Sequence, residues 1–315
     1  MDWLTLLNTN RLGCPKSDAT LRSTPLARTE FQRDFDRIVF SSAFRRLHGK
    51  TQVFPLPESD MTHTRLTHSL ETSCVGRSLG TIVGLEIHHR ESVSPADLAS
   101  IVAAACLAHD LGNPPFGHSG EKAIGQYFET RGQKFMKDFS EQQREDLLKF
   151  EGNALGFRML TNRKPSLTTV EGGFGLTYAT LGAFTKYPRF SVLAPSHGNR
   201  ASEKKFGVFE ADAGTYEEVA NELGIPRKPS TSSWYRHPLA FLVEAADDIC
   251  YRVMDLEDGY KLGLVGFDSA TKLLVAISKD DPKHTDIKGI TRIEDADQKI
   301  GFLRAKAINS LVHQA

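Results

Sequence analysis

The chain has 315 residues, of which 40% are hydrophobic and 25% are charged. This length predicts one large domain or two ordinary ones, and the composition is typical of a globular protein with a sizeable core. Lys plus Arg and Asp plus Glu number 39 each, so the net charge is zero. The chain as a whole therefore has no electrostatic attraction to nucleic acid or to an acidic membrane surface.

Targeting signals and cysteine pairs are not evident in the sequence. Residues Met1–Thr5 lack the cationic and apolar regions that begin a signal peptide. No stretch of about 18 uninterrupted apolar residues occurs, so we expect no membrane span. The four cysteines are scattered and form no CxxC pair: Cys14, Cys74, Cys106 and Cys250. We therefore expect a reduced, cytoplasmic protein with mostly buried thiols.

Apolar periodicity predicts helices through the first half of the chain. Residues 1–25 are rich in Asn, Ser, Thr and Pro, and we expect an irregular leader there. Apolar positions spaced by three and four then predict one helix over Thr29–Leu47 and a second from Arg65 to His88. Ser94 as N-cap and Pro95 at the first helical position open a third helix. That helix is expected to end at His109-Asp110.

The second half adds helices around a region of loops. We expect one helix to begin at His118 and a longer one to lie within Ser140–Leu160. The region 187–233 is rich in Gly and Pro, which predicts loops around one short helix, Tyr216–Leu223, with a mobile part near His197–Lys205. The remaining predicted helices are Trp234–Leu256 and an amphipathic segment, Gln298–Ala315. The last lacks a C-cap signal, so a fraying terminus and a chain cut inside a longer helix both remain open.

The fold class predicted from these elements is all-α, because no convincing set of alternating strand residues occurs. A helical domain over 26–280 would follow the leader. Residues 281–315 would then begin a C-terminal helical region, and truncation of that region is left open.

Metal-competent side chains lie on three of the predicted helices. His109-Asp110 ends an apolar run, His68 lies upstream, and Asp247-Asp248 lies downstream. Asp110 alone is explained as a cap, but the imidazole beside it is not. Taken singly, each histidine is more often a surface residue or a hydrogen-bonded core residue. Asp247 and Asp248 lie about 100° apart around their helix, so only one of them is expected to face the bundle.

Two imidazoles and two carboxylates form a ligand set for a divalent ion. Mixed nitrogen and oxygen ligands suit Mn, Fe, Co, Ni, Zn or Mg, whereas a closed structural zinc site more often uses cysteines. Four protein ligands on an octahedral ion leave positions for water and for a phosphate oxygen. Such an ion would polarise the phosphoryl group and lower the pKa of water. We expect Mn²⁺, Mg²⁺ or Co²⁺ and the hydrolysis of a phosphoester.

The order His…His-Asp…Asp, with each element on a helix, resembles the HD phosphohydrolase superfamily. Flanking segments between about Pro25 and Asp258 are similar to bacterial deoxyguanosinetriphosphate triphosphohydrolases: Arg28-Thr29-Glu30-Phe31-Gln32-Arg33-Asp34, Phe40-Ser41-Ser42-Ala43-Phe44-Arg45-Arg46-Leu47, His109-Asp110-Leu111-Gly112, Pro115-Phe116-Gly117-His118-Ser119-Gly120-Glu121 and Phe150-Glu151-Gly152-Asn153-Ala154. The resemblance implies an HD domain over 26–280. It also implies cleavage of a dNTP to a deoxynucleoside and intact triphosphate, by water attack at the α-phosphorus.

The resemblance assigns roles to the metal and phosphate end of such a site. It implies that the metal ligands are His68, His109, Asp110 and Asp247. His118 and Glu121 would serve proton transfer at the α-phosphate; the structural alternative for this pair is a helix cap. Arg65 would meet a phosphate as a bidentate donor, with a surface salt bridge as the alternative. Lys186, in the pair Lys186-Tyr187, would also meet the triphosphate.

The sugar end receives its assignments in the same way. Gln52 and Asp255 would contact the 3′-hydroxyl, and the Tyr251 ring would pack where a 2′-hydroxyl would otherwise sit. Asn153 would form a polar wall of the pocket. Without the resemblance, Tyr251 is explained as packing at the edge of the core, and Asn153 as a helical residue bonding its own backbone.

Two departures from the family pattern bear on function. Asn113 stands where the commonest family sequence has a histidine, which weakens the expected grip on phosphate or marks a subgroup that compensates elsewhere. Family members also usually run well beyond 315 residues. The resemblance further implies a homo-oligomer and raises a second, activating dNTP as a ligand.

Two other functions remain open at this point. One is an HD hydrolase of another nucleotide, such as a guanosine alarmone or a nucleoside monophosphate. The other is a non-catalytic module that senses nucleotides or single-stranded DNA. Basic residues available for such binding are Arg45-Arg46, Arg200 and Lys204-Lys205, although charged runs are usually solvated surface.

Overall fold

Helices make up nearly all the regular structure of the described chain, which has isolated β-bridges but no β-strand. The structure is a computed structural model, and it describes residues 2–14, 28–54, 62–91, 93–162, 173–192, 201–229, 231–278, 290 and 292–315. The all-α prediction is confirmed. The α-helices are α1 (Trp3–Leu6), α2 (Glu30–Val39), α3 (Ser42–Arg45), α4 (Arg65–Glu91), α5 (Pro95–Ala108), α6 (His118–Thr130), α7 (Glu141–Leu148), α8 (Gly152–Thr161), α9 (Tyr178–Phe184), α10 (Ala213–Glu222), α11 (Leu239–Lys261), α12 (Phe267–Ser278) and α13 (Ala296–Gln314).

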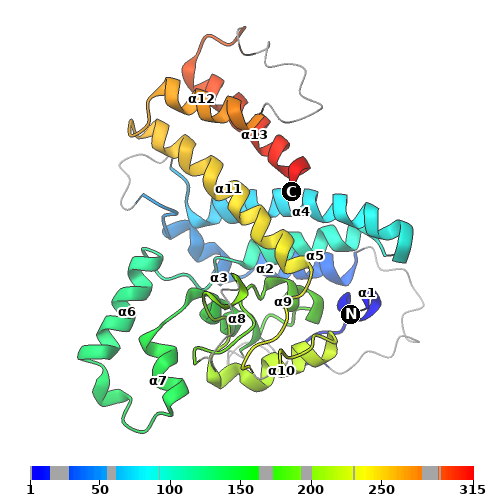
Figure 1. Ribbon diagram of the computed structural model, residues 1–315, viewed down its shortest axis with the longest axis vertical. Helices are drawn as coiled ribbons and strands as arrows, with labels where there is room; N and C mark the ends of the chain where they lie inside the picture. Colours follow the sequence, from blue (N-terminus) through cyan, green and yellow to red (C-terminus); the bar gives the residue numbers. More distant parts are fainter. Residues whose placement is uncertain are drawn as a thin grey trace.

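Helix α5 lies among α2, α4, α9 and α11 (Figure 1). Its sequence is apolar on every side, and residues around its circumference, such as Ile101, Val102 and Leu107, are fully buried. A helix that is apolar all round is stable only inside a core. The capping predicted from Ser94 is present, because its side chain accepts the backbone N–H of Asp97. This buried helix carries the residues that follow it into the interior.

Close packing fixes α4 against α5. Gly76, Gly80 and Gly84 recur once per helical turn on the face of α4 that meets α5. A Cβ atom at Gly80 would lie 2.8 Å from the Cα atom of Ala99. The two backbones therefore approach more closely than a larger residue allows. This contact holds the first turns of α4 beside the C-terminal end of α5.

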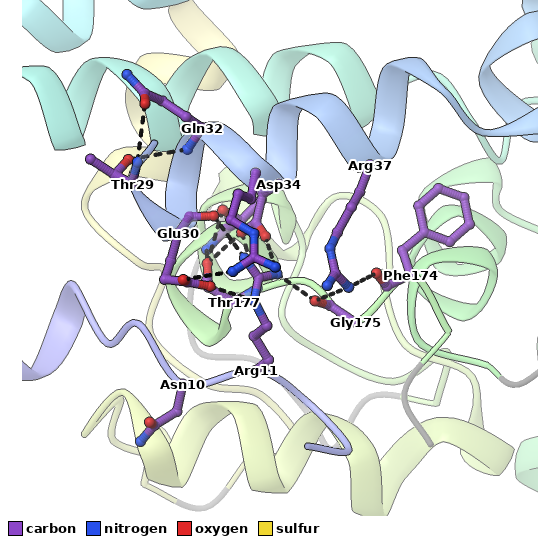
Figure 2. Close-up of polar contacts among 12 residues, drawn as sticks. Asn10, Arg11, Thr29, Glu30, Gln32, Asp34, Arg37, Phe174, Gly175 and Thr177 are labelled. Atoms are coloured by element: carbon purple, nitrogen blue, oxygen red, sulfur yellow. Dashed lines mark hydrogen bonds and ion pairs between the residues drawn. The ribbon is translucent and has the colours of Figure 1, made fainter. Parts of the chain in front are cut away.

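A buried ion-pair network ties the N-terminal segment to α2 and to the residues before α9 (Figure 2). The Arg11 guanidinium lies 2.8 Å from Glu30 Oε2 and 2.5 Å from Asp34 Oδ1, and it donates to the Gly175 carbonyl. The Thr177 hydroxyl and backbone N–H both donate to Asp34 Oδ2. Asp34 is completely buried, so each of its oxygens needs these partners.

A second, smaller core joins the C-terminal part of α11 to α12 and α13. Its buried members are Val253, Ala270, Leu274, Ile300, Leu303 and Ala307. Arg304 on α13 lies 2.6 Å from the buried carboxylate of Glu257 on α11. Figure 1 shows this group at one end of the molecule, next to the C-terminus. The predicted division near residue 280 falls within 279–289, which lie outside the described residues.

The predicted N-terminal leader is described only over residues 2–14. That part contains the one-turn helix α1, and Leu6 and Leu12 are buried in the main core. The rest of the leader lies outside the described residues.

Three predicted helix boundaries are wrong. The helix expected over Thr29–Leu47 ends at Val39, because the Ser41 side chain accepts the N–H of Phe44 and caps a new turn, α3, which runs on into a 3-10 helix, Arg46–Gly49. The helix expected within Ser140–Leu160 is divided between α7 and α8. The helix expected from Trp234 begins only at Leu239. In each case the apolar spacing continues across a break that capping or tertiary contacts impose.

The loop-rich region 187–233 contains the predicted short helix as α10, together with 3-10 turns at Ala201–Glu203 and Glu210–Asp212. Of the part predicted to be mobile, residues 197–200 lie outside the described residues. Helices α9 and α12 were not predicted. None of the described helices is both long enough and apolar enough to cross a membrane.

Candidate metal centre and the cavity beside it

Four predicted metal ligands converge from three helices. His68 lies in the first turn of α4, His109-Asp110 directly follows α5, and Asp247 lies on α11. Asp247 Oδ1 is 3.1 Å from His68 Nε2 and 3.5 Å from His109 Nε2, and Asp110 Oδ1 is 3.4 Å from His109 Nε2. One ligand atom each of His68, His109 and Asp110 lies within 4.8 Å of the others. Asp247, and not its neighbour Asp248, is the carboxylate that faces the imidazoles.

The protonation pattern of His109 fits a metal site. Its Nδ1 lies 2.6 Å from the Cys106 carbonyl oxygen, and because a carbonyl only accepts, Nδ1 carries the proton. Nε2 is then the atom that faces the cluster and that would bind an ion, which is the usual arrangement for a metal-binding histidine. His68 also turns Nε2 toward Asp247, while its Nδ1 is buried without a hydrogen-bond partner. These donors suit a divalent ion.

Both carboxylates of the cluster are ionised. Burial alone would raise the pKa of Asp247, but His109, His68 and Lys186 more than offset this effect and hold it well below the usual range. Burial likewise opposes ionisation of Asp110, and His109 and Arg65 lower its pKa. One buried and one partly buried negative charge beside two imidazoles make a strong site for a cation.

Asp110 is oriented by two further side chains. Arg65 Nη1 lies 2.8 Å from Asp110 Oδ2, and the Asn113 amide donates to Asp110 Oδ1. Arg65 thus makes a buried salt bridge instead of the surface one considered as its alternative. Its Nε is buried without a partner, and the residue lines the neighbouring cavity. The Asn113 side chain therefore supports the predicted metal ligand Asp110.

His118 and Glu121 form a pair at the start of α6. His118 Nδ1 lies 3.1 Å from Glu121 Oε2, and the imidazole is largely exposed while the carboxylate is buried. Positive φ angles at Phe116 and Gly117 turn the chain sharply just before His118. The N-cap of α6 is Gly117, which has no side chain with which to cap the helix. Glu121 caps a different helix instead, because its Oε1 accepts the N–H of Gly152 at the start of α8.

Gly152 joins the metal cluster to the His118–Glu121 pair. A Cβ atom at this position would lie 2.3 Å from Asn113 Oδ1 and 3.1 Å from Glu121 Oε1. Only glycine lets the first turn of α8 pack against Asn113 while it donates to Glu121. The same turn therefore fixes a neighbour of Asp110 and the partner of His118.

A cavity of about 690 Å³ opens beside the cluster. The predicted site residues that line it are Gln52, Arg65, His109, Asp110, His118, Asn153, Lys186, Tyr187, Asp247 and Tyr251. His68, Glu121 and Asp255 lie behind this lining, in contact with residues that form it.

Cationic side chains occupy one part of the cavity wall. Lys186 Nζ lies 3.7 Å from Asp247 Oδ2 and 3.5 Å from Glu244 Oε1, and it sits above the Tyr187 ring. Lys205 Nζ lies 3.1 Å from Glu151 Oε2 and 3.7 Å from Glu121 Oε2. The position of Lys205 was not predicted: in the sequence it is one half of a Lys-Lys pair typical of a solvated loop.

Neutral and weakly acidic groups occupy another part. Gln52 Oε1 is buried without a partner, and the Tyr251 ring is 47% exposed. Burial, together with the nearby charge of Asp258, raises the pKa of Asp255 to about 6, and its carboxylate shares a hydrogen bond with Tyr251. Asn153 donates to Glu151 Oε2 at 3.3 Å and not to its own backbone.

The chain is similar to known HD-domain proteins. The HD domain family, whose members are metal-dependent hydrolases, matches residues 65–161, which run from α4 to the end of α8. A deoxyguanosinetriphosphate triphosphohydrolase-like protein of Pseudomonas aeruginosa is 45% identical over the whole chain, which covers 70% of that relative. A protein of the same name from Synechocystis sp. is also 45% identical over the whole chain, covering 71% of its length. A deoxyguanosinetriphosphate triphosphohydrolase of Klebsiella pneumoniae is 36% identical over 75% of this chain and 52% of its own length.

The chain is an HD-domain phosphohydrolase. It belongs to the deoxyguanosinetriphosphate triphosphohydrolase-like family.

Proposed function

We propose that the protein hydrolyses dGTP or another dNTP to a deoxynucleoside and inorganic triphosphate. The main support for this proposal is that one cavity lies beside both the cluster of His68, His109, Asp110 and Asp247 and the His118–Glu121 pair. A site for metal-assisted hydrolysis needs both a cation that stabilises phosphoryl charge and a group that moves a proton. The predicted ligands His68, His109, Asp110 and Asp247 would hold that ion, with Mn²⁺, Mg²⁺ and Co²⁺ as candidates.

The triphosphate would lie along the cationic wall. Arg65 and Lys186 both line the cavity, and each approaches a cluster carboxylate, so they are placed beside the expected α-phosphate. Lys205 adds a third positive charge nearby. Fixed cations stabilise negative charge that develops on phosphoryl oxygens as the bond breaks.

Proton transfer would fall to His118. The Glu121 carboxylate accepts from Nδ1, which leaves Nε2 as the position that exchanges a proton with the substrate. In the reaction, a water oxygen bonds to the α-phosphorus while the bond from phosphorus to the 5′-oxygen breaks. His118, protonated on Nε2, would give that proton to the 5′-oxygen, and the proton lost by water would pass to solvent. When bound, the divalent ion supplies Lewis-acid stabilisation of the phosphoryl group.

The deoxyribose would lie against Tyr251, Gln52 and Asp255. The unpartnered Gln52 Oε1 is suited to accept a hydroxyl proton, and the carboxylate of Asp255 is a second acceptor. An exposed aromatic ring at Tyr251 would exclude a 2′-hydroxyl by contact.

The products test this function, and isotope labelling tests the bond that breaks. Wild-type protein with dGTP and Mn²⁺ in H₂¹⁸O should release one triphosphate per deoxyguanosine. The label should enter triphosphate and be absent from deoxyguanosine, because water attacks phosphorus. Release of pyrophosphate or of single phosphates would exclude the proposal, and label in the nucleoside would exclude attack at phosphorus. His118→Ala should lower kcat about 10²- to 10⁴-fold.

Several associations remain predictions from the sequence. They are a homo-oligomer, a second, activating dNTP, single-stranded DNA as a ligand, and a cytoplasmic location. Hydrolysis rates can be measured for the four dNTPs, singly and in pairs, with Mn²⁺, Mg²⁺ or Co²⁺ and with or without single-stranded DNA. These rates would show which dNTP is the substrate and whether a second dNTP or DNA activates its hydrolysis.

A further inference from the structure

A partly buried histidine outside the predicted site, His63, connects three elements at the sugar end of the cavity. His63 precedes α4, and its imidazole lies between two carboxylates. Nδ1 is 2.7 Å from Asp258 Oδ1 on α11, and Nε2 is 3.3 Å from Glu71 Oε1 on α4. The backbone N–H of His63 also donates to Asp258 Oδ2 at 3.0 Å. Asp258 thus accepts from both the ring and the backbone of one residue.

The backbone of His63 in turn holds the segment that carries Gln52. The His63 carbonyl accepts the N–H of Gln52 at 3.2 Å, and Thr64 forms a β-bridge with Thr51. Residues 51–54 belong to no helix, and within the described part of the chain these backbone contacts attach them to the residues just before α4. The buried, unpartnered Oε1 of Gln52 therefore depends on His63 for its position.

At neutral pH the charge of the His63 imidazole strengthens its contacts with Asp258 and Glu71. Hydrogen bonds to Asp258 and then to Glu71 raise the pKa of His63 to about 10, so the imidazole is cationic. It separates two carboxylates that would otherwise repel each other at close range. Asp258 also lies one turn after Asp255 on the same face of α11. One side of the cation therefore faces the helix that carries the second predicted sugar contact.

We propose that His63 is a positioning residue. Its contacts with Asp258 on α11 and Glu71 on α4 hold residues 51–54 in place, and we call this set of contacts the clamp. By fixing the position of Gln52, the clamp would determine how well the site binds the 3′-hydroxyl of the substrate. The clamp rests on the proposed function for the identity of the ligand, but not for the contacts themselves. Loss of the imidazole leaves Asp258 and Glu71 unbridged and releases the backbone pairing of residues 51–52. The metal cluster and the His118–Glu121 pair do not touch His63 and should be unaffected.

Two measurements on one set of variants test the clamp. The set is wild type, His63→Ala, His63→Gln and a control, His89→Ala, which removes an exposed histidine from the far end of α4. The first measurement is hydrogen–deuterium exchange over residues 50–54. The second is kcat and KM for dGTP and for 2′,3′-dideoxyGTP with Mn²⁺.

The expected results separate positioning from general damage. In His63→Ala the backbone N–H of Gln52 should exchange faster than in wild type. The kcat/KM for dGTP should fall about 10²-fold, because a small displacement of a substrate-positioning group can lower the rate by this factor. Its kcat/KM for dideoxyGTP should change less than about threefold, because that substrate lacks the hydroxyl. His63→Gln, which can still donate to one carboxylate, should be intermediate, and His89→Ala should match wild type.

Either of two results would overturn the clamp: unchanged exchange protection at Gln52 in His63→Ala, or an equal loss for the two nucleotides. If wild type itself treats dGTP and dideoxyGTP alike, recognition of the 3′-hydroxyl is wrong, and the exchange measurement still decides whether His63 holds the segment.

Discussion

Asp110 shows how single contacts orient one predicted metal ligand. Arg65 pairs with one carboxylate oxygen, Oδ2, and Asn113 donates to the other, Oδ1, which also lies 3.4 Å from His109 Nε2. Hydrogen bonds of this kind fix the orientation of a ligating carboxylate and lower the entropy lost when an ion binds. Asn113, the position at which the sequence departs from the family pattern, thus supports the predicted metal ligand Asp110.

Asn113→Ala should weaken metal binding without unfolding the protein. The Asp110 carboxylate would rotate more freely, so the Kd for Mn²⁺ should rise about 10- to 100-fold. Calorimetric titration of metal-free protein measures this, and circular dichroism checks that the fold is intact. An unchanged Kd would mean that Arg65 alone orients Asp110.

Tyr251→Ala should relax the choice between deoxyribose and ribose. Removing the ring opens space beside the sugar, so kcat/KM for GTP should rise relative to dGTP by about tenfold or more, the range expected for a lost steric contact. The matched control is Tyr127→Ala, which removes an exposed tyrosine from a different helix, α6. A ratio unchanged from wild type would place the 2′ position elsewhere in the cavity.

At the scale of elements, the sequence predicts those features that depend on neighbouring residues. Ser94 and Pro95 fix the start of α5 through local capping, and the apolar run fixes its burial. The break between α7 and α8 is different, because it depends on the Glu121 carboxylate reaching Gly152 from 31 residues away. The roles of His63 and Lys205 are equally hidden, since their partners are distant in the chain.

The Arg11 network offers a direct test of how the N-terminal segment is attached. Arg11→Ala leaves the fully buried Asp34 without its cation, and removal of one partner from a buried pair costs about 3–5 kcal/mol. Arg28→Ala removes an arginine from a mostly exposed pair with Asp36 and should cost about 1 kcal/mol or less. Urea unfolding measures both. An equal decrease in the free energy of unfolding for the two variants would show that the buried ion pairs of Arg11 stabilise the fold no more than the exposed pair of Arg28.

At the scale of the whole molecule, one buried histidine makes stability depend on pH. His237 donates from Nε2 to the Leu6 carbonyl and accepts the Leu239 N–H at Nδ1, so it links α1 to the start of α11 as a neutral ring. Burial lowers the pKa of His237 to about 4. The unfolded chain, with a pKa near 6.5, binds more protons between these two values.

The free energy of unfolding should therefore fall as the pH decreases from about 6.5 to about 4. The contribution from His237 has a slope of about 1.4 kcal/mol per pH unit at most, since one proton is taken up on unfolding. His237→Gln should be less stable at neutral pH but should lose this part of the slope. Chemical unfolding across the pH range measures it, and a slope identical in the two proteins would contradict the assignment.

We propose that His68, His109, Asp110 and Asp247 together hold one divalent ion. Calorimetric titration of metal-free protein with Mn²⁺ tests it most directly, with wild type, His109→Ala, Asp247→Ala and the neighbouring control Asp248→Ala side by side. We predict one tight ion per chain in wild type and in Asp248→Ala, and loss of that binding in the other two. Tight binding of Mn²⁺ by His109→Ala and Asp247→Ala would show that these side chains do not hold the ion.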